Sequence, residues 1–500
     1  MPDSEPATTS RGTRLALGAG ILAYAALLWA LIGAVPGGSD NSGYFNEARL
    51  FAQGRIHTPM RTLAGIPAQE VPFLYVPLGF RPAGAAQLVP TYPPGLPLLL
   101  VPAARLVGWE RAGDVILILH SLAGLALMFA LGRLCGLPGS WALAGAAVLA
   151  ASPLYLYTSL QALSDVPATA WATAAVVAAL KSRGQSGWAF ACGVCIAVGF
   201  LVRPTNFLVA IPVLFALGCS PARLGLAALG ALPGLAAWMA INHAAYGQVL
   251  ESGYGAIGHE FHAGLIPATL VFYARWLPLL LSPIVLAAPF ALALGRAGGR
   301  IAWMLVSWAA SFLAFYCAYR WTREQWWFLR FVLPAAPALI VAGLGALRHL
   351  FEKGGGPSGG ARRWLVPALV LVAALGVEAS QTNPLREARW IGSGERKYGR
   401  VADWLETHVP ADSVLVVSQA SGALYYYTGF TLLREEELSP AIADRVRASA
   451  RAGGHGLFAV LWPHEKEVLR KLPGTWAQIG SIEDVTVWRC GAEAPLPGGK

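Results

Sequence analysis

The sequence predicts an all-α polytopic membrane protein with about eleven transmembrane helices, followed by a small C-terminal α/β domain. Three observations support this fold class. Of the 500 residues, 56% are apolar and only 13% are charged, and the mean hydropathy is +0.52, unlike a soluble enzyme of this length. The 18 tryptophans and 15 tyrosines fit aromatic belts at two membrane surfaces. After Gln381 the long apolar stretches give way to alternating helical and strand patterns.

Apolar stretches of about the length that crosses a bilayer recur as far as Gln381. The expected spans are Leu15–Val35, Ala112–Leu131, Gly139–Tyr157, Val166–Leu180, Ser186–Val202, Thr205–Leu217, Leu224–Ile241, Ala268–Leu294, Ile301–Tyr319, Phe328–Ala346 and Leu365–Ala379. One further stretch, Tyr92–Pro102, contains four prolines and is short of the roughly 20 residues that a crossing needs. We expect it to be a re-entrant or interfacial element on the outer face.

The basic residues set the orientation, because Lys and Arg gather in cytoplasmic loops. With residues 1–14 as a cytoplasmic tail, the loops that also lie inside carry Arg133, Lys181, Arg183, Arg223, Arg296, Arg300, Arg348, Lys353, Arg362 and Arg363. Residues 15–381 then form the transmembrane domain of an inner (plasma) membrane protein. Its outer loops 36–111 and 242–267 and the domain 382–500 are extracytoplasmic. The net charge of +10 therefore reflects topology and does not indicate nucleic-acid binding.

The C-terminal region has the pattern of a layered α/β domain. Helices are expected over Glu395–His408 and Pro440–Ala452, and strands over Ser413–Val417, Leu457–Leu461 and Val485–Trp488. Tyr425–Leu433 also has β character. Alternation between the two faces of a half-buried strand explains its three successive tyrosines better than stacking on a sugar.

A single acid, Asp40, lies in a Gly/Ser-rich turn directly after the first span. A carboxylate anchors a helix poorly at the membrane surface, where Trp, Tyr, Lys and Arg are preferred. The segment behind it, Tyr44–Ala52, has helical spacing and is expected to lie along the membrane surface. Asp40 is therefore either a helix N-cap or a functional carboxylate at the mouth of the transmembrane domain.

Further charged groups gather on the expected outer face. Asp165 begins a span, and a proline two residues later makes a helix N-cap an equal alternative to a functional role. Arg203 lies between two spans on the side where arginine is avoided, and so do Arg320, Arg323 and Arg330 in a Trp-rich loop. Because Arg is suited to gripping phosphate oxygens, we expect these arginines to bind an outer-leaflet phosphate.

The outer loop after Asn242 contains His259 and His262. These histidines do not form a zinc protease motif, and no third ligand is evident. They are weak candidates for a metal site, and the polarity of a substrate-facing loop is the simpler explanation.

In their order along the chain, these features resemble the GT-C superfamily of membrane glycosyltransferases. The resemblance is to the branch of protein O-mannosyltransferases, lipid A aminoarabinose transferases and rhizobial lipopolysaccharide sugar transferases. The matching segments are Asp40 with Tyr44 and the helix behind them, Tyr92–Pro97, Ser164–Pro167, Arg203–Thr205 and Arg330–Pro337. Two features depart from the family pattern. Asp40 is followed by Asn41, where many members have paired acids, and the Pro-Pro segment lacks the basic residue that precedes it in the aminoarabinose transferases.

The resemblance implies an enzyme that moves a hexose or pentose from a polyprenyl-phosphate carrier to a hydroxyl group of an envelope glycan, lipid or protein. Asp40 would be the general base in an inverting single displacement. Tyr44, Tyr92 and the four arginines would bind the substrates, because the anionic leaving group needs positive charge more than a proton. Asp165 would orient the acceptor, or hold a divalent cation with Asp40 or a loop histidine. No other cofactor is expected.

The alternative is a transporter or flippase of lipid-linked envelope precursors. Against it, we expect no acid or base at mid-depth in any span, and neither half of the sequence repeats the other. A non-catalytic scaffold would leave the outer arginines and aspartates unexplained.

Overall fold

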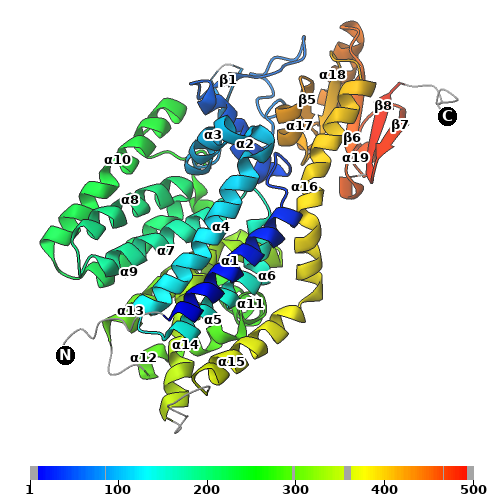
Figure 1. The fold of residues 1–500 in the computed structure, drawn as a ribbon. Coiled ribbons are helices and arrows are strands. Elements are labelled where there is room, and N and C mark those ends of the chain that lie inside the picture. Colours follow the sequence, from blue (N-terminus) through cyan, green and yellow to red (C-terminus); the bar gives the residue numbers. More distant parts are fainter. Residues whose placement is uncertain (1–9, 85, 295–298, 354–361, 466, 492–500) are drawn as a thin grey trace. The chain divides into compact units, whose positions relative to one another are not determined.

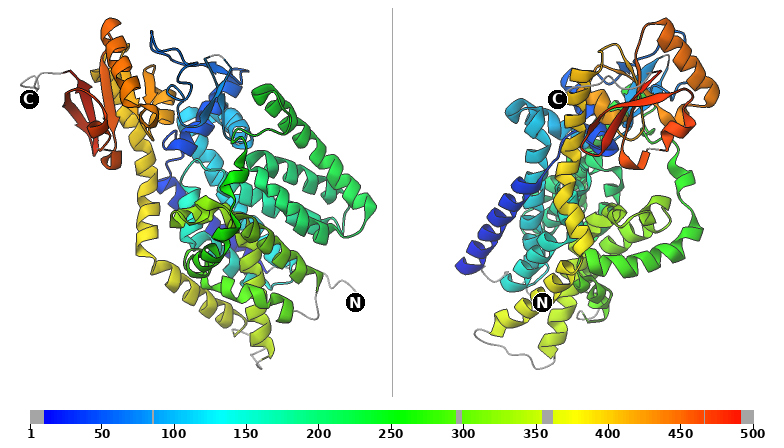
Figure 2. Two further views of the ribbon diagram at one scale, coloured as in Figure 1. Left: turned by 180° about the vertical axis from the view of Figure 1, so that it is seen from behind. Right: turned by 90° about the vertical axis from the view of Figure 1, so that its right-hand side faces the viewer.

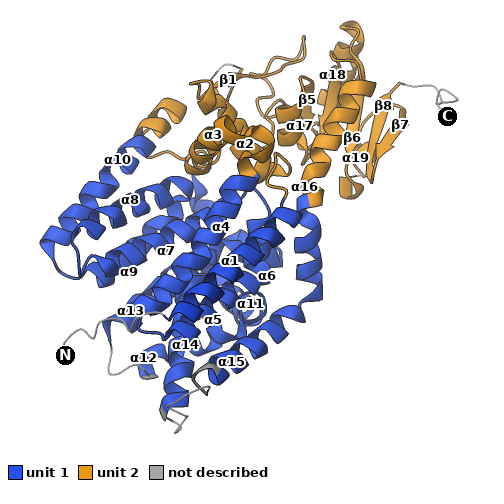
Figure 3. Ribbon diagram, viewed as in Figure 1, with its two compact units in different colours: residues 1–32, 114–239, 256–392 blue, residues 33–113, 240–255, 393–500 orange. Residues whose placement is uncertain are grey.

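The computed structural model describes residues 10–84, 86–294, 299–353, 362–465 and 467–491, and it is predominantly helical (Figure 1). The chain divides into two compact units, which Figure 3 colours separately. Unit 1 comprises residues 1–32, 114–239 and 256–392, and unit 2 comprises residues 33–113, 240–255 and 393–500. Each unit is therefore assembled from segments that are far apart in the sequence.

Unit 1 is a bundle of apolar helices that run side by side (Figure 2). Its α-helices are α1 (Arg11–Leu31), most of α4 (Trp109–Leu134), α5 (Gly139–Ala151), α6 (Pro153–Ser159), α7 (Asp165–Lys181), α8 (Gly187–Val202), α9 (Ala210–Leu217), most of α10 (Pro221–Tyr246), α11 (Ile266–Leu280), α12 (Ala291–Leu294), α13 (Arg300–Cys317), α14 (Ala336–Lys353), α15 (Arg362–Ala379) and the start of α16 (Thr382–His408). Its 3-10 helices are η1 (Pro204–Val209), η2 (Ile257–Glu260), η3 (Ala263–Leu265), η4 (Pro283–Phe290), η5 (Arg320–Arg323) and η6 (Trp326–Ala335).

Small residues let the helices of unit 1 approach closely, as is typical of membrane bundles. A Cβ atom on Gly193 of α8 would lie 1.9 Å from the carbonyl oxygen of Ala227 in α10. One on Gly230 of α10 would lie 2.2 Å from the carbonyl oxygen of Phe190. The two backbones therefore touch, and glycine is required on both sides of the contact.

Six helices within the described residues are long and apolar enough to cross a membrane, or up to eight if each of two bent pairs counts as one span. The protein is thus a multi-pass membrane protein, but the expected count of about eleven is not confirmed. Four apolar helices are shorter than a full crossing, namely Gly95–Val107, Gly187–Val202, Pro204–Leu217 and Pro283–Ala293. Proline accounts for part of this, because Pro283 breaks the expected span Ala268–Leu294 between α11 and η4.

Unit 2 contains a five-stranded mixed sheet with the strand order β5-β4-β6-β8-β7. β4 pairs in parallel with β5 and β6, and β8 pairs antiparallel with β6 and β7. Its elements are α2 (Ser39–Ala52), β1 (Thr58–Pro59), β2 (Phe80–Ala83), β3 (Gln87–Pro90), α3 (Gly95–Val107), β4 (Val414–Val417), α17 (Ser421–Tyr427), β5 (Thr431–Arg434), η7 (Glu435–Glu437), α18 (Pro440–Ala452), β6 (Leu457–Leu461), η8 (Pro463–Glu465), α19 (Val468–Lys471), β7 (Trp476–Ile482) and β8 (Val485–Cys490). Both β4 and β6 are buried along their whole length, which explains their uninterrupted apolar sequences.

The α/β character of the C-terminal region is confirmed, and α18 and β6 have the expected bounds. The expected strand at Tyr425–Tyr427 is wrong, because these residues belong to helix α17 and β5 begins only at Thr431. Helical geometry turns successive side chains by about 100°, so the rings point in different directions. Tyr425 packs on Phe80, whereas Tyr426 packs on Phe45. Strand β7 was not expected.

Candidate active site

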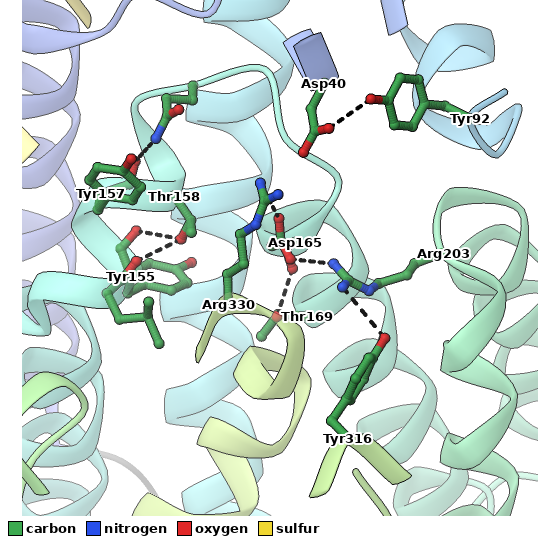
Figure 4. Close-up of polar contacts among 12 residues, drawn as sticks. Asp40, Tyr92, Tyr155, Tyr157, Thr158, Asp165, Thr169, Arg203, Tyr316 and Arg330 are labelled. Carbon is green, nitrogen blue, oxygen red and sulfur yellow. Dashed lines mark hydrogen bonds and ion pairs between the residues drawn. The ribbon is translucent and has the colours of Figure 1, made fainter. Parts of the chain in front are cut away.

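In unit 2, three of the expected site residues meet at the start of α2. The hydroxyl group of Tyr92 donates a hydrogen bond of 2.7 Å to Oδ1 of Asp40 (Figure 4). The rings of Tyr44 and Tyr92 lie 4.9 Å apart, and Tyr254 packs edge-on against Tyr92. Burial, followed by the charge of Asp40, raises the pKa of Tyr92 well above its ordinary value, so the phenol stays protonated and can donate.

Asp40 is not the N-cap of α2. The cap position is Gly38, which has no side chain, and Asp40 lies in the first turn of the helix. A carboxylate there is favoured by the helix dipole and accepts the Tyr92 hydroxyl. The structural alternative for Asp40 is therefore not supported by its geometry.

The helix behind Asp40 forms as expected, but it does not present one apolar face to the membrane surface. Nearly all of its side chains are buried. Asn46 donates to the carbonyl oxygen of Gly422 at 2.9 Å, and Arg49 donates to that of Tyr426 at 2.6 Å with its guanidinium over the same ring. Asn46 and Arg49 are thus used for packing inside unit 2.

Two acids near this turn were missed by sequence reasoning. Glu395 in α16 is 8% exposed, and its Oε2 atom accepts hydrogen bonds of 2.7 Å from both Gly38 N and Asn41 Nδ2. Burial raises the pKa of Glu395 to about 7, against the two hydrogen bonds that lower it. The sequence contains a pattern that could have identified Glu395 as a buried residue. Glu395 precedes Tyr398 by three residues and Ala402 by seven, which places all three on the buried side of a charged helix.

Glu47 is the second missed acid. It lies three residues after Tyr44, on the same side of α2, and is 3% exposed. Its Oε2 atom has no hydrogen-bond partner among the described residues. Burial raises its pKa well above the ordinary value, because a carboxylate loses its hydration there.

In unit 1, Asp165 lies between two arginines that sequence reasoning placed on the same outer face (Figure 4). It is the first residue of α7 and is 2% exposed. It forms an ion pair with Arg203, and Arg330 Nη1 lies 3.8 Å from its Oδ2 atom. Arg203 also lies 3.5 Å from the hydroxyl group of Tyr316. The Asp165 side chain is therefore used in an ion-pair cluster and does not cap its helix.

The other two arginines differ in their surroundings. Arg320 is half exposed and pairs with Glu260 at 3.2 Å. Arg323 has a buried Nε atom that no described residue contacts by a hydrogen bond. Arg330 also has a buried Nε atom without a hydrogen-bond partner among the described residues, and a buried donor that is left unpaired is costly.

The loop histidines do not build a metal site. His259 contacts Glu260 at 3.0 Å, but the part of the chain that the structure describes contains no group of three or more His, Cys, Asp or Glu side chains that could hold a metal ion. The structure therefore gives no support to a metal site at the loop histidines, and the divalent cation considered for Asp165 with Asp40 or a loop histidine stays a prediction.

Ionisable side chains do lie within helices long enough to span, among them the buried Asp114 in α4, His120 in the same helix and Arg275 in α11, which corrects the expectation for the spans. His120 in α4 donates from Nδ1 to the carbonyl oxygen of Ile116 and accepts from Trp171 at Nε2. Arg275 in α11 lies over the ring of Trp276. Among the described residues, neither His120 nor Arg275 forms an ion pair with an acid; their contacts are with a backbone carbonyl group and tryptophan rings.

No protein-family model and no curated protein matches the sequence. Several solved structures nevertheless share the fold. ArnT from Cupriavidus metallidurans, solved with undecaprenyl phosphate, has a TM-score of 0.57 at 14% identity, and the match covers 96% of this chain and 99% of that one. Arabinofuranosyltransferase AftD from Mycobacteria has a TM-score of 0.54 at 14% identity, with 98% and 40% covered. The Archaeoglobus fulgidus oligosaccharyltransferase AglB, solved with a dolichol-phosphate, has a TM-score of 0.51 at 13% identity, with 90% and 69% covered.

The chain therefore shares the fold of these polytopic membrane proteins, which is the fold that the order of the sequence motifs predicted. The match to ArnT extends over both units, because nearly the whole of each chain is covered.

Proposed function

We propose that this protein is a GT-C glycosyltransferase of the inner membrane that moves a hexose or pentose from a polyprenyl phosphate to a hydroxyl group on the outer face. The observation that carries the proposal is the pair of largely buried arginines at Asp165 in unit 1. Arg203 and Arg330 both lie at the carboxylate of Asp165, and the Nε atom of Arg323 has no hydrogen-bond partner among the described residues. Guanidinium groups are well suited to binding phosphate oxygens, and the phosphate of a lipid carrier is the anion that we propose they hold.

In the reaction, Asp40 takes the proton of the acceptor hydroxyl as its oxygen attacks the anomeric carbon. The bond from that carbon to the carrier phosphate breaks, the phosphate leaves with the electron pair, and the configuration inverts. Tyr92 holds the Asp40 carboxylate through its 2.7 Å hydrogen bond and, with Tyr44, offers ring faces to a sugar.

The arginines stabilise the negative charge on the departing phosphate. Arg330 and Arg203 are oriented by Asp165, so we assign Asp165 the role of fixing the two guanidinium groups rather than orienting the acceptor. No step is assigned to a divalent cation, because the arginines supply the positive charge that the departing phosphate needs.

The test is sugar transfer by purified protein in detergent, with radiolabelled polyprenyl-phosphate hexose and pentose donors and an envelope extract as acceptor. Wild type should give a labelled covalent product, and Asp40→Asn should give none while retaining its folding, because Asn keeps the size of the side chain and removes the base. Transport of the lipid-linked sugar without any covalent product would support the transporter or flippase and reject the transferase. Turnover by Asp40→Asn at the wild-type rate would remove Asp40 as the base.

A further inference from the structure

The turn that carries Asp40 is held by a residue from the C-terminal part of the chain. Gly37 and Gly38 form this turn and have no side chains of their own to fix it. Oε2 of Glu395 accepts from Gly38 N and from Asn41 Nδ2, at 2.7 Å each, so it grips the residues on both sides of Ser39 and Asp40. A Cβ atom on Gly37 would lie 1.8 Å from this oxygen, so the contact requires glycine there.

The contact also supplies what the start of α2 lacks. The first N–H groups of a helix need acceptors, and its N-terminus attracts negative charge. Gly38 is the N-cap and makes no side-chain hydrogen bond. The Glu395 carboxylate therefore does for α2, from a distant segment, what the Glu of a capping box does from the third helical position, because it accepts from the N–H group of the N-cap residue.

The ionised carboxylate of Glu395 is stabilised by the N–H donors of the turn and not by a neighbouring cation of the described residues. No Lys or Arg of the described residues forms an ion pair with it. The titratable groups that face it are Asp40 from α2, Tyr398 from its own helix and Tyr427 from α17, and none of them carries a positive charge. Its ionised form is stabilised by the two N–H donors, so the turn and the carboxylate hold each other in place.

We propose that Glu395 is the positioning residue of the Asp40 turn, and that only its ionised form holds Gly38 and Asn41 firmly enough for Asp40 to act. Protonation weakens both bonds, because hydrogen bonds to a charged acceptor are about twice as strong as neutral ones. Glu395 itself touches no substrate. For its activity readout this inference rests on the proposed function, but its structural readout does not.

The first experiment measures the transfer rate against pH for wild type, Glu395→Gln, Glu395→Asp and the control Glu406→Gln, which changes an exposed acid of the same helix. Wild type should lose activity as the pH falls through about 7, where Glu395 takes up a proton. Glu395→Gln should lower kcat about tenfold at high pH, with KM little changed. Its activity should no longer fall as the pH passes through about 7. Glu395→Asp keeps the charge. It should therefore retain part of the wild-type rate and should still lose activity as the pH falls. A Glu395→Gln profile that superimposes on that of Glu406→Gln overturns the proposal.

The second experiment needs no substrate. Hydrogen exchange of the segment 37–44 is followed by mass spectrometry in the purified full chain, with Asn41→Ala as a milder variant that removes one of the two bonds. Glu395→Gln and Asn41→Ala should both exchange faster than Glu406→Gln at pH 8, by about fivefold or more. Equal exchange in all variants overturns the proposal. Faster exchange in a protein that transfers no sugar from any donor keeps the positioning role and rejects the proposed function instead.

Discussion

Two carboxyl groups serve the same turn of unit 2 in different environments. Asp40 accepts from a tyrosine hydroxyl at the start of a helix, whereas Glu395 is buried and accepts from a backbone N–H and an amide. Asn41 explains why the position next to Asp40 is not a second acid. An Asp there would lose the donor to Glu395 and would place a third carboxylate beside two others.

Glu395 should make the stability of the protein depend on pH in the opposite direction from its activity. Burial raises the pKa of Glu395 from 4.5 to about 7, so between these values the folded chain binds more protons than the unfolded chain. The contribution of this group to stability is therefore complete below about pH 4.5 and is lost as the pH rises through about 7. The melting temperature of wild type relative to Glu395→Gln should fall between these pH values. A difference that stays constant with pH would mean that Glu395 keeps an ordinary pKa.

Arg330 allows a test of phosphate binding against membrane anchoring. Arg330→Lys keeps the charge but loses the planar fork, and one lost charge-assisted hydrogen bond in a buried site costs roughly 1.5–3 kcal/mol, or about tenfold to a hundredfold in rate. Arg320 is the matched control, because it is half exposed and already paired with Glu260. Transfer rates against donor concentration should separate the two variants. Equal curves for Arg330→Lys and Arg320→Lys would reduce Arg330 to an anchor that can snorkel to the head groups.

At the scale of elements, we predict that the close contact between α8 and α10 requires glycine at the contacting positions. Gly230→Ala would place a Cβ atom 2.2 Å from a backbone oxygen of α8, so the helices must separate. Gly225→Ala on the same helix meets nothing within 4 Å and should be neutral or stabilising by up to about 1 kcal/mol, because Ala is the better helix former. Thermal unfolding in one detergent should show a lower melting temperature for Gly230→Ala alone. Equal melting temperatures would show that the two helices separate without cost.

Element patterns were predictable where the period was clear and local. Pro440–Ala452 has a strong helical period with Ser439 as its cap, and Leu457–Leu461 is a continuous apolar run, so both were found at their bounds. Tyr425–Tyr427 was misassigned because aromatic residues favour strands, while the short helix is selected by the parallel connection from β4 to β5. The arginines and both aspartates stood out because charge is rare near a membrane. Glu395 and Glu47 did not, because their importance comes from contacts that only the tertiary structure makes.

At the scale of the whole molecule, the Lys and Arg distribution predicts which side each loop faces. His259 should face outward and Gln185 inward, and both positions are exposed, whereas Ser164 is buried and unsuitable for labelling. In a background without the six native cysteines, His259→Cys should react with a membrane-impermeant reagent in cells with a permeabilised outer membrane. Gln185→Cys should react only after lysis. The reverse pattern would mean that the short helix Gly95–Val107 crosses the membrane after all.

The grip of Glu395 on Gly38 also has a consequence for biosynthesis. Residue 38 leaves the ribosome early, whereas its partner is made more than 350 residues later, after every expected transmembrane segment has been threaded into the membrane. Until then the glycine turn has no acceptor for its backbone N–H, and the Asp40 helix has no cap. A nascent chain that stops at Gln381 would therefore expose an unfinished turn on the far side of the membrane. The proposed activity would then begin only when the last fifth of the chain has been translated, and a prematurely terminated copy could occupy the membrane without it.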